Sequence, residues 1–199
     1  MKEKTKDFIP VTVKSGNELK NIEFKFEYGV TLISGKPGTG KSTIVRQILT
    51  YMANSEQGKY EVFLADTTGY EFCRLNDLPT NIMRDLLFET RQDDIKRFID
   101  KIHMELVKKI NVMRQHDCNN IESLPEEKRM PTTVVIIDDI CFLLDNLKSQ
   151  EYLQKFAMLT IVGGACGFVF VLLCQDYKKL QESLPMIAWQ MIKQKIYLS

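Results

Sequence analysis

Hydrophobic positions along the chain follow two spacings in turn, and this alternation predicts strands and helices in succession. Continuous apolar or β-branched runs predict four buried strands, at residues 30–33, 60–65, 132–137 and 168–173. Apolar residues at helical spacing predict helices at residues 42–52, 93–113 and 149–161, with a shorter one at 178–182. Strands that alternate with helices favour a mainly parallel sheet covered on both faces, with its ligand at the carboxyl ends of the strands.

The chain before the first buried strand has a different pattern. Residues 11–13 and 22–26 alternate apolar and polar positions around Ser15-Gly16-Asn17, which predicts a short β-hairpin. Residues 1–6 are polar and charged, so we expect a loose start. A last edge strand is expected over residues 195–198. A length of 199 residues suits one core, and we expect a single α/β domain over residues 1–199.

Composition and charge narrow the class of protein. A hydrophobic content of 44% with 27% charged residues is ordinary for a soluble globular protein. The net charge of +1 excludes binding of nucleic acid by overall charge, but it is compatible with a local basic patch. The polar face of the long predicted helix is either solvated or a surface for nucleic acid or another partner. Its basic residues are Lys96, Arg97, Lys101, Lys108, Lys109 and Arg114.

The cysteines and apolar runs bear on localisation. Five cysteines show no C-x-x-C spacing, and Cys141, Cys166 and Cys174 lie in apolar runs, which favours reduced, buried thiols in a cytosolic protein. The charged first residues do not resemble a signal peptide, and the longest apolar run, residues 161–174, is only 14 residues long and contains three glycines. We therefore expect a cytoplasmic protein without its own transmembrane segment. A peripheral position at the inner face of a membrane and a membrane-anchored partner are the alternatives kept open.

The segment between the first buried strand and the next helix carries the strongest chemical signal. Residues 35–42 satisfy G-x-x-x-x-G-K-[ST], the pattern of a phosphate-binding loop. Glycines let successive N–H groups point into one concavity, where the helix N-terminus adds partial positive charge. Lys41 is expected to reach the β- and γ-phosphates, and the Ser42 hydroxyl to ligate Mg²⁺. The predicted nucleotide-binding residues are Gly35, Lys36, Pro37, Gly38, Thr39, Gly40, Lys41, Ser42 and Thr43.

Two strand ends compete for the acidic role beside Mg²⁺. Asp66 begins a D-x-x-G match typical of GTPases, but no base-reading [NT]-K-x-D follows it, which disfavours a guanine-nucleotide switch. Asp138 and Asp139 end a more apolar strand and form the better Walker B motif. We expect Asp138 to hold Mg²⁺ through water and Asp139 to polarise the attacking water, because successive strand residues point to opposite sides. We also expect this strand to lie next to the strand that enters the P-loop.

Gln175 follows the fourth predicted strand, at an end that in such sheets lies next to the γ-phosphate. Its amide is a candidate sensor of ATP against ADP, and a strand-end glutamine without such a role is the alternative. The strand–helix unit between the P-loop and the acidic strand is typical of motor ATPases and disfavours small kinases. The predicted catalytic residues are therefore Lys41, Asp139 and Gln175, and the predicted metal-binding residues are Ser42 and Asp138.

These residues together resemble the FtsK/SpoIIIE family, a branch of the RecA-like P-loop NTPases. Asp66 with Glu71-Phe72 resembles the D-x-x-x-x-E-L segment of that family, and residues 167–175 resemble its G-I-H-L-I-L-A-T-Q strand, which carries Gln175 as the sensor. Residues 9–17, 104–106, 119–121 and 130–131 resemble further family segments. The resemblance implies ATP and Mg²⁺ as cofactors. It also implies a homo-hexameric ring with the nucleotide at subunit interfaces and a polymer moved through its centre.

Two departures from the family pattern bear on activity. The usual Asp-Glu of Walker B is Asp138-Asp139, whose second side chain is one methylene shorter, and Gly164 stands where the family commonly has an arginine. Slow hydrolysis is expected from both. Double-stranded DNA, as in conjugation, plasmid or phage systems, is the first expectation for the cargo. A polypeptide carried by a type VII-like secretion ATPase is the second, and a nucleotide-binding scaffold with little turnover is the third.

Overall fold

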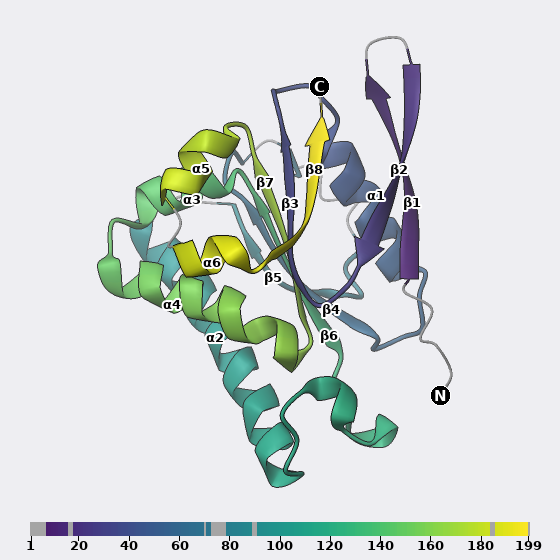
Figure 1. The fold of residues 1–199 in the computed structure, drawn as a ribbon, viewed down its shortest axis with the longest axis vertical. Coiled ribbons are helices and arrows are strands. Elements are labelled where there is room, and N and C mark those ends of the chain that lie inside the picture. Colours follow the sequence, from purple (N-terminus) through teal and green to yellow (C-terminus); the bar gives the residue numbers. More distant parts are fainter. Residues whose placement is uncertain are drawn as a thin grey trace.

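Six parallel strands form the central sheet of the protein, in the order β5-β4-β6-β7-β3-β8 (Figure 1). The computed structural model describes residues 7–15, 18–69, 71–72, 79–88, 91–183 and 186–198. The strands are β3 (Gly29–Gly35), β4 (Tyr60–Asp66), β5 (Met83–Leu87), β6 (Thr132–Asp138), β7 (Phe168–Cys174) and β8 (Ile192–Leu198). Every residue of β3, β4 and β7 is buried, as expected of parallel strands covered on both faces.

Helices cover the two faces of the sheet unequally. The helices are α1 (Lys41–Ala53), α2 (Gln92–Gln115), α3 (Ile140–Leu147), α4 (Gln150–Val162), α5 (Tyr177–Ser183) and α6 (Met186–Gln190). Three short 3₁₀ turns are η2 (Ile121–Ser123), η3 (Glu126–Lys128) and η4 (Gly163–Cys166). One core cluster joins α2, α3, α4 and α5 to one face, and a second joins α1 to the other. The α/β fold expected from the alternating pattern is confirmed.

An antiparallel hairpin, β1 (Asp7–Ser15) and β2 (Glu18–Phe26), lies outside the sheet beside α1 (Figure 1). Its buried side chains Ile9, Val11, Val13 and Phe24 belong to the core cluster of α1. The predicted hairpin is confirmed, with longer strands than the alternation indicated. Gly16 and Asn17, expected in its turn, lie outside the described residues.

The strand order corrects one expectation about the acidic strand. We expected β6 next to β3, but β7 lies between them and pairs with both, Val134 with Val169 on one side and Val30 with Phe170 on the other. After β6 the chain crosses the sheet face through α3 and α4, and β7 then enters the space between β6 and β3. The elements missing from the sequence prediction are β5, α3 and α6.

The polar face predicted for the long helix also needs a correction, because Lys109 is fully buried. Its Nζ donates to the main-chain oxygens of Pro131 (2.5 Å) and Gly167 (3.5 Å), and it lies 5.0 Å from the ring centroid of Phe168. Burial lowers the pKa of Lys109 to about 8, against the opposing effect of Glu105 and Glu61. Lys109 therefore belongs to the core at the amino-terminal end of the sheet, away from solvent.

Candidate functional site

The loop between β3 and α1 curls around the side chain of Lys41. Gly38 and Gly40 adopt left-handed backbone angles, with φ of 80° and 93°, which favour glycine. The Lys41 Nζ donates to the main-chain oxygens of Gly35 (2.8 Å) and Lys36 (3.0 Å). The ammonium therefore already lies at the centre of the loop, where a phosphate would replace these carbonyl oxygens.

A cavity of about 240 Å³ opens above this loop. Its lining comes from the P-loop, from the segment after β4 and from the ends of β6 and β7. The lining residues are Pro37, Gly38, Gly40, Lys41, Ser42, Thr43, Thr68, Glu71, Asp138, Asp139 and Gln175. The predicted residues Gly35, Lys36 and Thr39 are not among them. They shape the loop from behind, since the Thr39 hydroxyl also donates to the Lys36 oxygen (2.8 Å).

Asp138 ends β6 with a side chain that is 5% exposed. Burial raises the pKa of this carboxyl to about 7, and the negative charges of Glu71, Asp66 and Asp139, in that order, add to the rise. Lys41 acts in the opposite direction. The cavity therefore presents the carboxylates of Asp138, Asp139 and Glu71 and the Ser42 hydroxyl, which are oxygen donors of the kind that a hard divalent cation prefers.

The fit to a cation depends on ligands from outside the protein. The described residues contain no group of three His, Cys, Asp or Glu side chains that could hold a metal ion. A magnesium ion keeps several waters and takes phosphate oxygens when it binds with a nucleotide. Ser42 and Asp138 lie in the same cavity and fit that pattern, although the strands before them are not neighbours.

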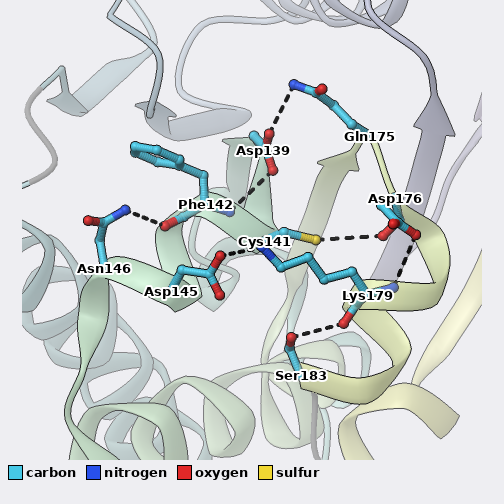
Figure 2. A network of polar contacts seen from close by, with 9 residues as sticks. All are labelled: Asp139, Cys141, Phe142, Asp145, Asn146, Gln175, Asp176, Lys179 and Ser183. Atoms are coloured by element: carbon cyan, nitrogen blue, oxygen red, sulfur yellow. Dashed lines mark hydrogen bonds and ion pairs between the residues drawn. The ribbon is translucent and has the colours of Figure 1, made fainter.

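Asp139 begins α3 in a left-handed conformation, with φ of 54° and ψ of 73°. Its carboxylate accepts hydrogen bonds from the backbone N–H of Phe142 (3.2 Å) and from Nε2 of Gln175 (3.1 Å), as Figure 2 shows. We expected Asp138 and Asp139 to point to opposite sides of a strand. They line the same cavity instead, because the chain leaves the strand geometry at residue 139.

A network of polar contacts joins α3 to the segment that carries Gln175 (Figure 2). The Cys141 thiol donates to the Asp176 oxygen (3.7 Å), and Lys179 forms an ion pair with Asp145 (2.5 Å). Burial raises the pKa of Cys141 to about 12, so the thiol is not a nucleophile at neutral pH. The helix after Asp139 and the helix after Gln175 are therefore coupled by side chains.

The four described cysteines are free thiols. Cys141, Cys166 and Cys174 are buried, as expected from their apolar runs, and Cys118 is half-buried. Cys73 lies outside the described residues.

The sequence prediction missed two residues of the cavity, Thr68 and Glu71. Both follow β4 in the segment that begins with Asp66. Asp66, the rejected candidate for the acidic strand, is fully buried, and it does not line the cavity. The D-x-x-x-x-E spacing was the available signal for Glu71.

The sequence of the chain matches a known protein family over most of its length. The model of the FtsK/SpoIIIE family matches residues 4–192. No curated protein sequence matches the chain. In the part of the chain that the structure describes, no helix combines the length and hydrophobicity needed to cross a membrane.

Solved structures with the same fold include ATPase modules of two larger proteins and a conjugation coupling protein. EssC (ATPases 2 and 3) from Geobacillus thermodenitrificans has a TM-score of 0.75 at 17% identity over 96% of this chain and 36% of that one. EccC (ATPases 2 and 3) of Thermomonospora curvata, in complex with a signal sequence peptide, has a TM-score of 0.72 at 15% identity over 96% and 36%. The pCW3 conjugation coupling protein TcpA with ATPγS has a TM-score of 0.62 at 20% identity over 89% and 52%.

These similarities carry the fold and no more, since identities are low. The expected RecA-like P-loop NTPase fold is confirmed. The chain spans little more than a third of the EssC and EccC chains it matches, 36% of each.

Proposed function

Because the chain belongs to the FtsK/SpoIIIE family of P-loop ATPases, we propose that it binds ATP with Mg²⁺ in the cavity above the P-loop and hydrolyses it slowly. The observation that carries the proposal is the meeting of Lys41, Ser42, Asp138, Asp139 and Gln175 around one cavity of about 240 Å³. These side chains come from three separate strand ends, and only the fold brings them together.

Each residue has a role that follows from its position. Lys41 exchanges its bonds to the two loop carbonyls for bonds to the β- and γ-phosphates. The Ser42 hydroxyl would ligate the cation and Asp138 would accept a hydrogen bond from one of its waters. The bound cation would neutralise charge on the phosphates. Asp139 orients the attacking water, and Gln175 senses the γ-phosphate through its bond to Asp139.

Slow hydrolysis is supported by the hydrogen bonds that the Asp139 carboxylate already accepts. Each oxygen of its carboxylate already accepts one bond, from the Phe142 N–H and from Nε2 of Gln175, so only part of its acceptor capacity remains for the attacking water. No arginine lines the described cavity, and an arginine supplied in trans is worth about 10³ to 10⁵ in rate. Gly164, the position of the family arginine, packs against the backbone of Gly29 at the amino-terminal end of β3, far from its own P-loop.

We propose further that the domain acts as one module of a homo-hexameric ring and that its cargo is a polypeptide, as in type VII-like secretion. The basic residues on α2 support this choice over DNA. Three of them form ion pairs: Arg97 with Asp94 (2.7 Å), Lys101 with Asp85 (2.7 Å) and Lys108 with Glu105 (2.9 Å). In each pair the carboxylate neutralises a positive charge that binding of DNA phosphates would require.

Translocation of double-stranded DNA is the second candidate. The similarity to the conjugation coupling protein TcpA favours it, and DNA was the first expectation from the sequence. A DNA motor should bind duplex DNA with an affinity that falls steeply with salt, and its phosphate release should rise when DNA is added.

Nucleotide binding and cargo are tested in sequence. Titration of the wild-type protein with a fluorescent ATP analogue should show Mg²⁺-dependent binding, which Lys41→Ala abolishes and Lys128→Ala, an exposed lysine in η3, retains. Phosphate release is then measured with and without duplex DNA and with and without a signal-sequence peptide, across protein concentrations. Stimulation by DNA alone would contradict the polypeptide cargo. Equal binding by Lys41→Ala and the wild type would contradict the proposed nucleotide site.

A further inference from the structure

The segment that follows β4 closes one side of the nucleotide cavity and has no role so far. Thr68 and Glu71 contribute to the lining, and Glu71 has an exposed side chain. Neither belongs to the P-loop, to the acidic pair or to the sensor strand. The way this segment is held gives Glu71 a defined place beside the cation-binding residues.

The first anchor of the segment is the buried carboxylate of Asp66. One oxygen accepts from the Thr68 hydroxyl (2.9 Å) and the Gly69 N–H (3.0 Å), and the other accepts from the Phe72 N–H (2.8 Å). A fully buried carboxylate is stable only when its oxygens are bonded in this way. Asp66 therefore fixes the backbone on both sides of Glu71 relative to the end of β4.

The second anchor comes from α1, the helix that begins at the P-loop. Arg46 donates through Nη2 to the main-chain oxygen of Glu71 (2.5 Å), and its guanidinium lies 5.5 Å from the ring centroid of Phe72. Phe72 is itself fully buried in the core under α1. Arg46 is four residues after Ser42, so the two side chains share one face of the helix. Glu71 is therefore held at the face of α1 that presents the Ser42 hydroxyl.

Charge explains what this placement achieves. Glu71 and Asp138 line the same cavity, Glu71 from the segment after β4 and Asp138 from the end of β6. Two carboxylates that face one cavity repel each other unless a cation lies between them. Asp66 does not line the cavity, and Asp139 is held by Phe142 and Gln175 for its proposed role toward the attacking water. Glu71 and Asp138 are therefore left as the pair of cavity carboxylates on the side of the cation.

We infer that Glu71 is a second magnesium-side carboxylate, which with Asp138 accepts hydrogen bonds from waters of the nucleotide-bound Mg²⁺ while Ser42 ligates the ion directly. The inference rests on the proposed nucleotide binding. Asp66 is the positioning residue that presents Glu71. The described residues contain no group of three His, Cys, Asp or Glu side chains that could hold a metal ion directly. Contact through water molecules agrees with this, because Mg²⁺ bound with a nucleotide keeps several waters.

The test compares nucleotide affinity with and without the ion. A fluorescent ADP analogue is titrated in excess EDTA and again in excess Mg²⁺. The ratio of the Kd in EDTA to the Kd in Mg²⁺ measures how much the ion strengthens binding. Glu71→Gln should lower this ratio about tenfold, about 1.4 kcal/mol, because one of two carboxylates facing the ion is lost. Its Kd in EDTA should stay unchanged or tighten, since a negative charge near the phosphates is removed. Glu56→Gln, an exposed carboxylate after α1, should keep the wild-type ratio.

Asp66→Asn tests the positioning role. An amide cannot accept all three bonds, so this variant should lower the ratio as Glu71→Gln does, while the double variant should lower it no further. Thermal unfolding and the Kd in EDTA show whether Asp66→Asn keeps the fold, and binding of Mn²⁺ with ADP, followed by electron paramagnetic resonance, reports on the ion directly. If Asp66→Asn fails to fold, Glu71→Gln alone decides.

Three outcomes would overturn the inference in different ways. A Glu71→Gln ratio equal to that of Glu56→Gln would show that Glu71 does not act on the ion. Equal weakening in EDTA and in Mg²⁺ would show that it supports the pocket in general. Wild-type protein that binds no nucleotide under either condition would overturn the proposed function, and this inference with it.

Discussion

Replacing Lys109 by methionine should change how the stability of the protein depends on pH. The Lys109 ammonium is fully buried at the amino-terminal end of the sheet, where burial lowers its pKa from 10.5 to about 8. The charged and titratable groups that act on it are Glu105, Glu61 and Cys166. Methionine has a similar length and no charge, so the variant removes the titration while it keeps most of the packing.

The sign and size follow from proton linkage. Between pH 8 and pH 10.5 the unfolded chain holds a proton on Lys109 that the folded chain has lost, so stability rises with pH in this window. The buried ammonium lowers the free energy of unfolding in full below this window, and the loss disappears above it. The lowered pKa of Lys109 reduces the free energy of unfolding by about 3 kcal/mol at pH 7 and by about 2 kcal/mol at pH 9.

Urea unfolding of wild type and Lys109→Met at pH 7, 8 and 9 measures this difference. The variant leaves the Pro131 oxygen without the Lys109 donor, which costs about 1–3 kcal/mol at every pH, whereas the Gly167 oxygen still accepts from the Thr133 N–H (3.1 Å). The free energy of unfolding of the wild type should therefore rise by about 1 kcal/mol relative to that of the variant from pH 7 to pH 9. The pH-independent cost of the lost hydrogen bond does not affect this difference. Lys108→Met, whose lysine is 65% exposed, should show no such trend. A flat or falling difference for Lys109→Met would refute the reasoning.

Three further predictions concern the site and the core. Asp139→Asn should lower phosphate release at least about tenfold while the Kd for nucleotide changes less than about twofold, and an unchanged rate would remove Asp139 from catalysis. Phe72→Ala should lower the free energy of unfolding in urea by about 3–5 kcal/mol because the ring is fully buried, and a loss under 1 kcal/mol would contradict that packing. Gly163→Ala should cost about 1–3 kcal/mol, since its Cβ would lie 2.8 Å from the Phe170 ring. Gly164→Ala, with its nearest contact at 3.4 Å, is the matched control, and an equal loss in both would refute the steric argument.

The P-loop and the central strands were predictable because their causes are local. The glycine spacing of residues 35–42 follows from the backbone angles of the loop itself, and β3 and β7 are continuous apolar runs. The strand β5 escaped prediction because its five residues include Arg84 and Asp85 at a sheet edge. The helix α3 escaped because five of its eight residues are buried, which hides the helical spacing.

The candidate site was predictable only as far as its motifs are local. Strand order depends on where each crossover returns, and no local pattern placed β7 between β3 and β6. The position of Glu71 depends on Asp66 and Arg46, which belong to two other elements. The burial of Lys109 likewise depends on the oxygens of Pro131 and Gly167, both distant along the chain.

The place of β7 between β3 and β6 limits how the domain can move during the proposed cycle of ATP binding and hydrolysis. A strand bonded on both edges and buried on both faces cannot slide, because a slip of one residue would turn its core side chains to the opposite face. The central strands below the nucleotide cavity therefore keep their positions relative to one another. Under the proposed motor function, we expect the movement at the segment held by Asp66 and at the linked helices α3 and α5, and a spectroscopic label belongs there.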